Sequence, residues 1–316
     1  MPCDETLFHT LTALHRTNAF AMEARKRADL ALGALLRTQL GWRLNNPTEV
    51  NTEIRERAAG LIATGEKLMT WEERDAARLM KHLAVGKDEN SYASLAFPEA
   101  ALEPQFLEWQ AVIMASMRGR LPMSNLEDVT RARMEELADQ LPVASWWREH
   151  VFSSSFISLA RIIAETGDLS NYATVSKVWK RMGLAVMDGK RQGGLLKTAA
   201  KEDWIAHGYN PKRRAIMFVV GDSLVKSNER YRAVYLLEKE RQRAKAEAEG
   251  LTVAPSAKIP AKRKDEFRSD GHVHKRAQRY MEKQLLADLW SAWQGRTDDD
   301  VIPRSGVSSP PIADAA

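Results

Sequence analysis

Apolar residues recur at helical spacing along most of this chain. Between Glu5 and Gly41, leucines and alanines return every three or four residues, which places them on one stripe of a single long helix. Residues with β-branched side chains are scattered rather than clustered, which favours helices over strands. Further helices are predicted at residues 48–64, 70–85, 106–117, 126–141, 153–167, 175–182, 211–227, 230–249 and 272–293. The pattern therefore predicts an all-α fold.

A helix-hairpin-helix element is predicted between Ile157 and Gly183. Its first helix ends at Gly167, which suits the left-handed conformation of a helix C-cap, and residues 168–171 turn the chain. Thr174 precedes a short second helix that Gly183 closes. Turns of this class present backbone N–H groups to phosphate. The core is expected to include Trp146, Trp147, Val178, Trp179 and Leu184.

Gly119 and Pro122 lie between two predicted helices, and both residue types end helices. We therefore place a domain boundary near residue 120. The final residues are acidic and then rich in proline and serine, which is typical of disorder. Residues 251–264 hold two prolines and are predicted as a linker or loop. The predicted parts are a helical N-terminal region (1–120), a helical domain that contains the hairpin (121–296) and a disordered tail (297–316).

The first helix carries a polar residue, Asn18, on its apolar stripe. A buried asparagine can fix the register of a helix pair at a cost in stability. The partner helix could come from a second copy of the chain, which would make a homo-oligomer. It could equally come from the same chain, as in an ordinary amphipathic helix. The sequence leaves both interpretations open.

Composition limits the classes of protein that fit this chain of 316 residues. One cysteine, Cys3, excludes a disulfide framework and a thiolate zinc site, and it fits a reducing compartment. No apolar run approaches ~18 residues, so no membrane partner is expected. Asp4 and Glu5 stand where a signal peptide would be positive, so a cytoplasmic location is predicted. His272 and His274 alone are a weak donor set, so we predict no metal and no cofactor.

Positive charge is concentrated in the segment from Lys177 to Arg214. It holds ten Lys or Arg residues against three Asp or Glu, a local charge of +7, whereas the whole chain carries +5. Such a segment can be a solvated helix face, but here the charges lie on a loop and at helix starts beside glycines. Lysines and arginines neutralise phosphates and release counterions. The predicted nucleic-acid-binding residues are Lys177, Lys180, Arg181, Lys190, Arg191, Lys197, Lys212, Arg213 and Arg214.

The same part of the chain resembles the helical C-terminal domain of serine- and DEDD-type insertion-sequence transposases. The sequence Leu-Ala-Arg-Ile-Ile-Ala-Glu-Thr-Gly-Asp-Leu at residues 159–169 is similar to the opening of that domain. Further matches follow in the family's order: Lys177–Leu184, Lys190–Gly194, Asn210–Arg214, Tyr231, Tyr235, Lys275–Ala277, Leu285-Leu286 and Leu289-Trp290. The resemblance implies an all-helical domain that acts on DNA.

Two departures from the family bear on activity. The family's nucleophilic serine follows its Gly-Leu pair, and here Asp188 stands near that position; a carboxylate cannot form the phosphoserine link. The family's RuvC-like half needs strands whose acidic residues bind Mg²⁺, and residues 5–86 are predicted to be helical. No catalytic residue is therefore predicted.

These observations predict a transposase-like protein of a mobile element or prophage that binds DNA, or structured RNA, and has no catalytic residues. One alternative is an active transposase or recombinase with another nucleophile. A second alternative is a helical adaptor whose basic face binds an acidic protein. The salt dependence of DNA binding separates the adaptor from the other two.

Overall fold

The protein is all-α, as the pattern predicted. The computed structural model of the protein describes residues 5–151, 155–187, 189–196 and 198–296. Most of these residues lie in α-helices, and the strands are short. The α-helices are α1 (Glu5–Gln39), α2 (Thr48–Ala84), α3 (Pro104–Ala138), α4 (Ala144–His150), α5 (Phe156–Thr166), α6 (Val175–Arg181), α7 (Lys201–His207), α8 (Pro211–Ser227), α9 (Glu229–Ala248) and α10 (Asp270–Trp293).

The strands form two small pairs, which the sequence did not predict. β1 (Val186–Met187) and β2 (Lys190–Arg191) are antiparallel, and β3 (Thr252–Ala254) and β4 (Phe267–Ser269) are parallel. The segment predicted as a linker or loop at residues 251–264 therefore contains a strand, which pairs with the strand directly before α10. The short 3₁₀ helices are Glu89–Ser91, Glu99–Leu102, Leu169–Asn171, Ser256–Lys258 and Ala261–Glu266.

Two predicted breaks between helices are wrong. The segments predicted as separate helices at residues 48–64 and 70–85 form the single helix α2, and Gly65 lies inside it. A Cβ at Gly65 would lie 2.5 Å from Ile113 Cγ2, so the glycine allows α2 and α3 to approach closely. Pro122 likewise lies inside α3, which also contains the predicted boundary near residue 120. Tertiary packing overrides the local preference at Gly65.

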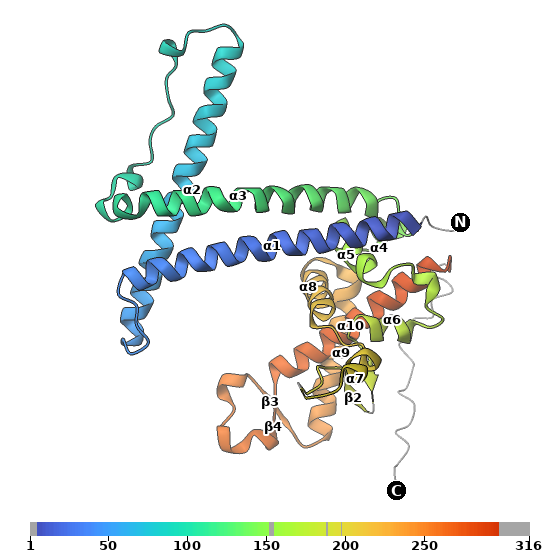
Figure 1. The fold of residues 1–316 in the computed structure, drawn as a ribbon. Helices are drawn as coiled ribbons and strands as arrows, with labels where there is room; N and C mark the ends of the chain where they lie inside the picture. The colour runs from blue at the N-terminus through green and yellow to red at the C-terminus, as the bar shows by residue number, and fades with distance from the viewer. Residues whose placement is uncertain (1–4, 152–154, 188, 197, 297–316) are drawn as a thin grey trace. The chain divides into compact units, whose positions relative to one another are not determined.

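The chain separates into two compact units. One unit is residues 16–130, and its core is formed where α1, α2 and α3 pack together. Within it, α1 and α3 lie side by side (Figure 1). The buried Asn18 Nδ2 donates to the Glu127 carbonyl oxygen at 2.8 Å and to Thr130 Oγ1 at 3.0 Å. The polar residue on the stripe of α1 therefore pairs with α3 of its own chain.

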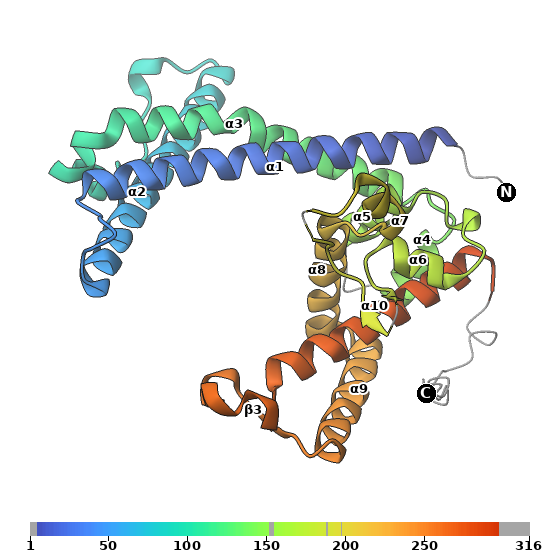
Figure 2. The ribbon, with the colours of Figure 1, turned by 60° about the horizontal axis from the view of Figure 1, so that its bottom comes forward.

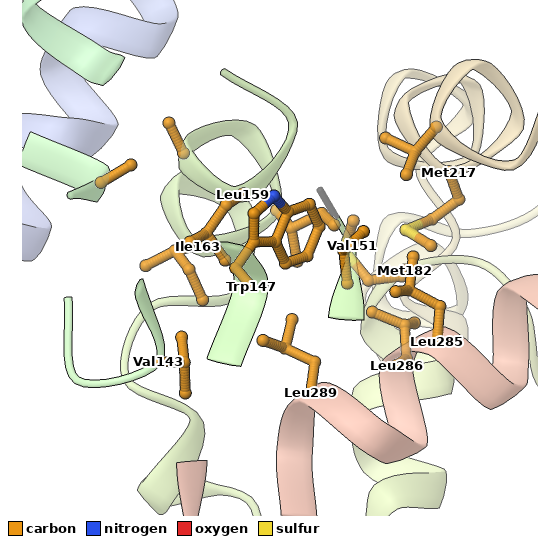
Figure 3. Close-up of a cluster of buried hydrophobic side chains, with 14 of the residues drawn as sticks. Val143, Trp147, Val151, Leu159, Ile163, Met182, Met217, Leu285, Leu286 and Leu289 are labelled. Atoms are coloured by element: carbon orange, nitrogen blue, oxygen red, sulfur yellow. The ribbon is translucent and has the colours of Figure 1, made fainter. Parts of the chain in front are cut away.

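The other unit combines residues 5–15 with the described residues from 131 onward. Its α10 contacts α6, α8 and α9 (Figure 2). Trp147 is buried among Leu159, Ile163 and Leu289 at the centre of the core (Figure 3). Trp146 is half-buried against the same cluster, so the prediction that these tryptophans belong to the core is confirmed.

Candidate nucleic-acid interface

The predicted hairpin is present and its turn is fixed by specific hydrogen bonds. Gly167 ends α5 with φ of 73°, a conformation that suits glycine. Asp168 Oδ1 accepts hydrogen bonds from the Ser170 amide at 2.8 Å and from Trp293 Nε1 at 2.9 Å. The Tyr172 hydroxyl donates to the Thr166 carbonyl oxygen at 2.8 Å. The hydrogen bond from Trp293, the last residue of α10, therefore helps to fix the conformation of the turn.

The second helix of the hairpin, α6, presents one apolar and one basic side. Val178 and Leu184 are fully buried, and half-buried Trp179 donates from Nε1 to the Lys283 carbonyl oxygen at 3.0 Å. The prediction that these three residues belong to the core is confirmed. Lys177 and Lys180 are exposed on the opposite side.

Two of the predicted binding arginines are bound to the end of α5 instead. Arg181 Nε donates to the Glu165 carbonyl oxygen at 2.8 Å, and Arg213 Nε contacts Glu165 Oε2 at 2.7 Å. His15 Nε2 lies 3.3 Å from Glu165 Oε1. The hydrogen bond from His15 and the Arg213 guanidinium together lower the pKa of Glu165 to about 2. These cations stabilise the hairpin.

A basic groove lies beside the hairpin, between α8, α9, α10 and the β1–β2 pair. Its volume is about 1240 Å³. Among the described residues that line it, one side chain is a carboxylate, Glu238, and seven are Lys or Arg. The cations of the groove are Lys190, Arg191, Arg214, Lys275, Arg276, Arg279 and Lys283.

The basic groove continues toward the β3–β4 pair. A second hollow of about 610 Å³ shares His272 and Arg276 with it and adds Lys264 and Arg268. Partial burial, Arg276, Arg268 and Arg191 together lower the pKa of His272. Cations from three different segments therefore act on one histidine, which shows how closely the charges converge.

Helix α10 supplies one wall of the groove. His272, Arg276, Arg279 and Lys283 recur every three or four residues, so they share one face of the helix. That face extends about 16 Å, at 1.5 Å per residue. The face presents a basic or titratable group at each turn.

Three of the groove cations are anchored by neighbours. Arg214 Nη1 lies 2.8 Å from Oε2 of the fully buried Glu282. Arg279 Nη2 donates to the carbonyl oxygens of Gly183 and Ala185, both at 3.1 Å. Lys283 Nζ lies 4.9 Å from the centre of the Trp179 ring, in a cation–π contact. These contacts fix the inner wall of the groove.

Glu282 reaches Arg214 because α8 and α10 pack closely at Gly221. A Cβ at Gly221 would lie 2.8 Å from both Cγ and Oε1 of Glu282. Burial raises the pKa of Glu282 to about 7, although Arg214 and Arg279 act in the opposite direction. The groove therefore has a buried titratable carboxyl group directly behind its wall.

Of the nine predicted binding residues, the structure describes eight, and three of these line the basic groove. Lys190, Arg191 and Arg214 line the basic groove. Lys197, like Asp188, falls outside the described residues. The groove lining does not include Lys177, Lys180, Arg181, Lys212 or Arg213.

Sequence reasoning missed the four cations that α10 contributes: Lys275, Arg276, Arg279 and Lys283. The basic segment predicted from the sequence ends at residue 214, whereas these cations follow much later in the chain. The available signal was the spacing of basic residues along the last helix, which places them on one face.

Within the described part of the chain, no group of three or more His, Cys, Asp or Glu side chains is placed to hold a metal ion. None of the described helices is both long enough and apolar enough to cross a membrane. No protein-family model matches the chain, and neither a curated protein nor a solved structure shows significant similarity to it.

Proposed function

We propose that this protein binds nucleic acid through the basic groove. One observation carries the proposal: among the described residues that line one hollow, seven are Lys or Arg and one is a carboxylate. A phosphate backbone is the partner that such a surface suits, because each neutralised phosphate releases condensed counterions. DNA is the proposed partner, and structured RNA offers the same backbone chemistry.

The spacing of the cations favours a polymer with regular charge over an acidic protein. Basic groups recur at each turn of α10, about 5.4 Å apart, and Lys190 and Arg191 extend the row from the β1–β2 turn. A phosphate backbone presents charges at a constant interval, whereas an acidic protein surface does not.

The resemblance to insertion-sequence transposases supports DNA as the partner. Segments that carry the resemblance include the hairpin, the β1–β2 turn, the start of α8 and α10, and three of these form or border the groove. We propose a transposase-like DNA-binding protein of a mobile element or prophage.

The proposal is tested by neutralising exposed cations of the groove. Replacing Lys190, Arg191, Lys275 and Arg276 together by Ala should weaken DNA binding. The slope of log K against log salt should fall by about 3, at 0.7–0.9 per lost phosphate contact. A matched control replaces four exposed cations outside the groove: Arg131, Arg133, Lys226 and Lys245. An unchanged slope in the groove variant, or an equal fall in the control, would exclude the groove.

We expect the isolated protein neither to cut nor to join DNA. The residue aligned with the family's nucleophile is Asp188, and a carboxylate cannot form the phosphoserine link. Supercoiled plasmid with Mg²⁺ or Mn²⁺, with and without copurified RNA, provides the assay. Nicking that a single Asp or Ser substitution abolishes would contradict this expectation and favour an active transposase.

A further inference from the structure

The shape of the basic groove restricts the form of nucleic acid that it can hold. Its inner cations are recessed: the Arg214 side chain is 19% exposed, and Arg279 is half-buried. Proteins read a duplex by inserting a protruding helix or ribbon into its grooves. The basic groove is recessed, and the described residues that line it form no protruding element that could enter a duplex. A duplex that lay across its rim would therefore leave the inner cations without phosphates.

The dimensions suit a short stretch of one strand. A stacked strand carries one phosphate per about 3.4 Å. The α10 cations of the groove extend about 12 Å from Lys275 to Lys283, so they can follow about four phosphates. That length is within the roughly 4–16 nucleotides that single-strand-binding folds occupy.

Two aromatic side chains line the groove together with the cations. Phe218 on α8 is 43% exposed, and Tyr280 on α10 is half-buried. The two helices are joined there, because Gln278 Nε2 donates to the Phe218 carbonyl oxygen at 2.9 Å. A single exposed phenylalanine is common on protein surfaces, but this one opens into a hollow lined by cations. Unpaired bases stack on such rings, whereas paired bases are already stacked on each other.

We infer that the basic groove takes an unpaired strand of nucleic acid, with its phosphates along the α10 cations and its bases against Phe218 and Tyr280. This inference rests on the proposed function and adds the strandedness of the ligand. A bare strand has the same backbone charge and open π-faces whether its sugar is deoxyribose or ribose.

The test compares three fluorescent ligands on the full chain: a 12-nucleotide DNA strand, an RNA strand of the same sequence and the blunt DNA duplex. At least one strand should bind about 10-fold tighter than the duplex. Phe218→Leu and Tyr280→Leu should each weaken strand binding by about 10-fold and leave the salt slope unchanged, because they remove stacking and no charge. Tyr280→Phe should retain affinity, because the ring is kept.

The control for these variants is Val219→Ala, which changes an exposed apolar residue of α8 that does not line the groove. Its affinity should equal that of the unchanged protein, and melting curves should show that all variants fold. Equal or tighter binding of the duplex, with the four-cation variant still impaired, would overturn the inference while the proposed function stands. Absence of salt-dependent binding to all three ligands would overturn the proposed function itself.

Discussion

Neighbouring arginines at the start of α8 contact two carboxyl groups in different surroundings, one at the hairpin and one behind the basic groove. Arg213 contacts Glu165 at the end of α5, and the adjacent Arg214 contacts Glu282 behind the groove wall. Glu165 is partly exposed and has a second partner, His15, so its pKa falls to about 2. Glu282 is fully buried, and burial raises its pKa to about 7. The balance between donors and burial decides which charge state each carboxyl group favours.

The cations of the hairpin and those of the basic groove also differ in how many carboxylates lie near them. At the hairpin, Arg181 and Arg213 are both held by Glu165. Among the described residues of the groove, seven Lys or Arg surround Glu238 and the buried Glu282. A surplus of positive charge in a hollow favours an external anion, whereas the hairpin arginines are held by the carboxylate and the carbonyl oxygen of Glu165.

The largest effect is expected from removing the carboxylate of the hairpin. Glu165→Ala leaves Arg213 and His15 partly buried without their partner and should lower the free energy of unfolding by about 3 kcal/mol. Urea denaturation at neutral pH measures this change. The matched control is Glu149→Ala, whose side chain is 75% exposed, and it should change stability by less than about 0.5 kcal/mol.

The same variant can be examined at low pH. The pKa of Glu165 is lowered in the folded state, so its contribution is present above its ordinary value of 4.5 and is lost as the pH falls toward 2. The difference between the unchanged protein and Glu165→Ala should therefore shrink in that range. A difference that stays constant down to pH 2 would contradict the assignment of Glu165 as the ionised centre.

An effect of similar size, with the opposite dependence on pH, is expected at Glu282. Its pKa is raised in the folded state, so its contribution is present below 4.5 and is lost as the pH rises through about 7. Relative to Glu282→Gln, the unchanged protein should lose about 3 kcal/mol of stability between pH 4.5 and pH 8. Parallel stability curves for the two proteins over this range would show that Glu282 is ionised throughout.

The smallest effect is expected from the exposed lysines of the hairpin. Lys190→Ala with Arg191→Ala, in the groove, should reduce the salt slope of DNA binding by about 1.5. Lys177→Ala with Lys180→Ala should reduce the slope by less than about 0.5, because these lysines do not line the groove. Equal reductions would show that α6 and the groove bind one continuous ligand.

Local sequence pattern predicted most helices of the unit that includes the described residues from 131 onward. The bounds of α5, α8, α9 and α10 lie within a few residues of those expected, because caps such as Gly167 and Asn210 act on their own turns. The same rules failed at Pro122, which lies inside α3, and at Gly65, where packing against α3 keeps α2 continuous.

The sequence by itself determined the all-α fold and the segment of highest positive charge, because helical periodicity and net charge are properties of neighbouring residues. It could not determine which cations act together. Only the tertiary structure joined Lys190, Arg191 and Arg214 to the cations of α10, and it bound Arg213 to Glu165 instead. Adjacent residues of α8 point in directions about 100° apart, so their partners depend on which helix packs on each side.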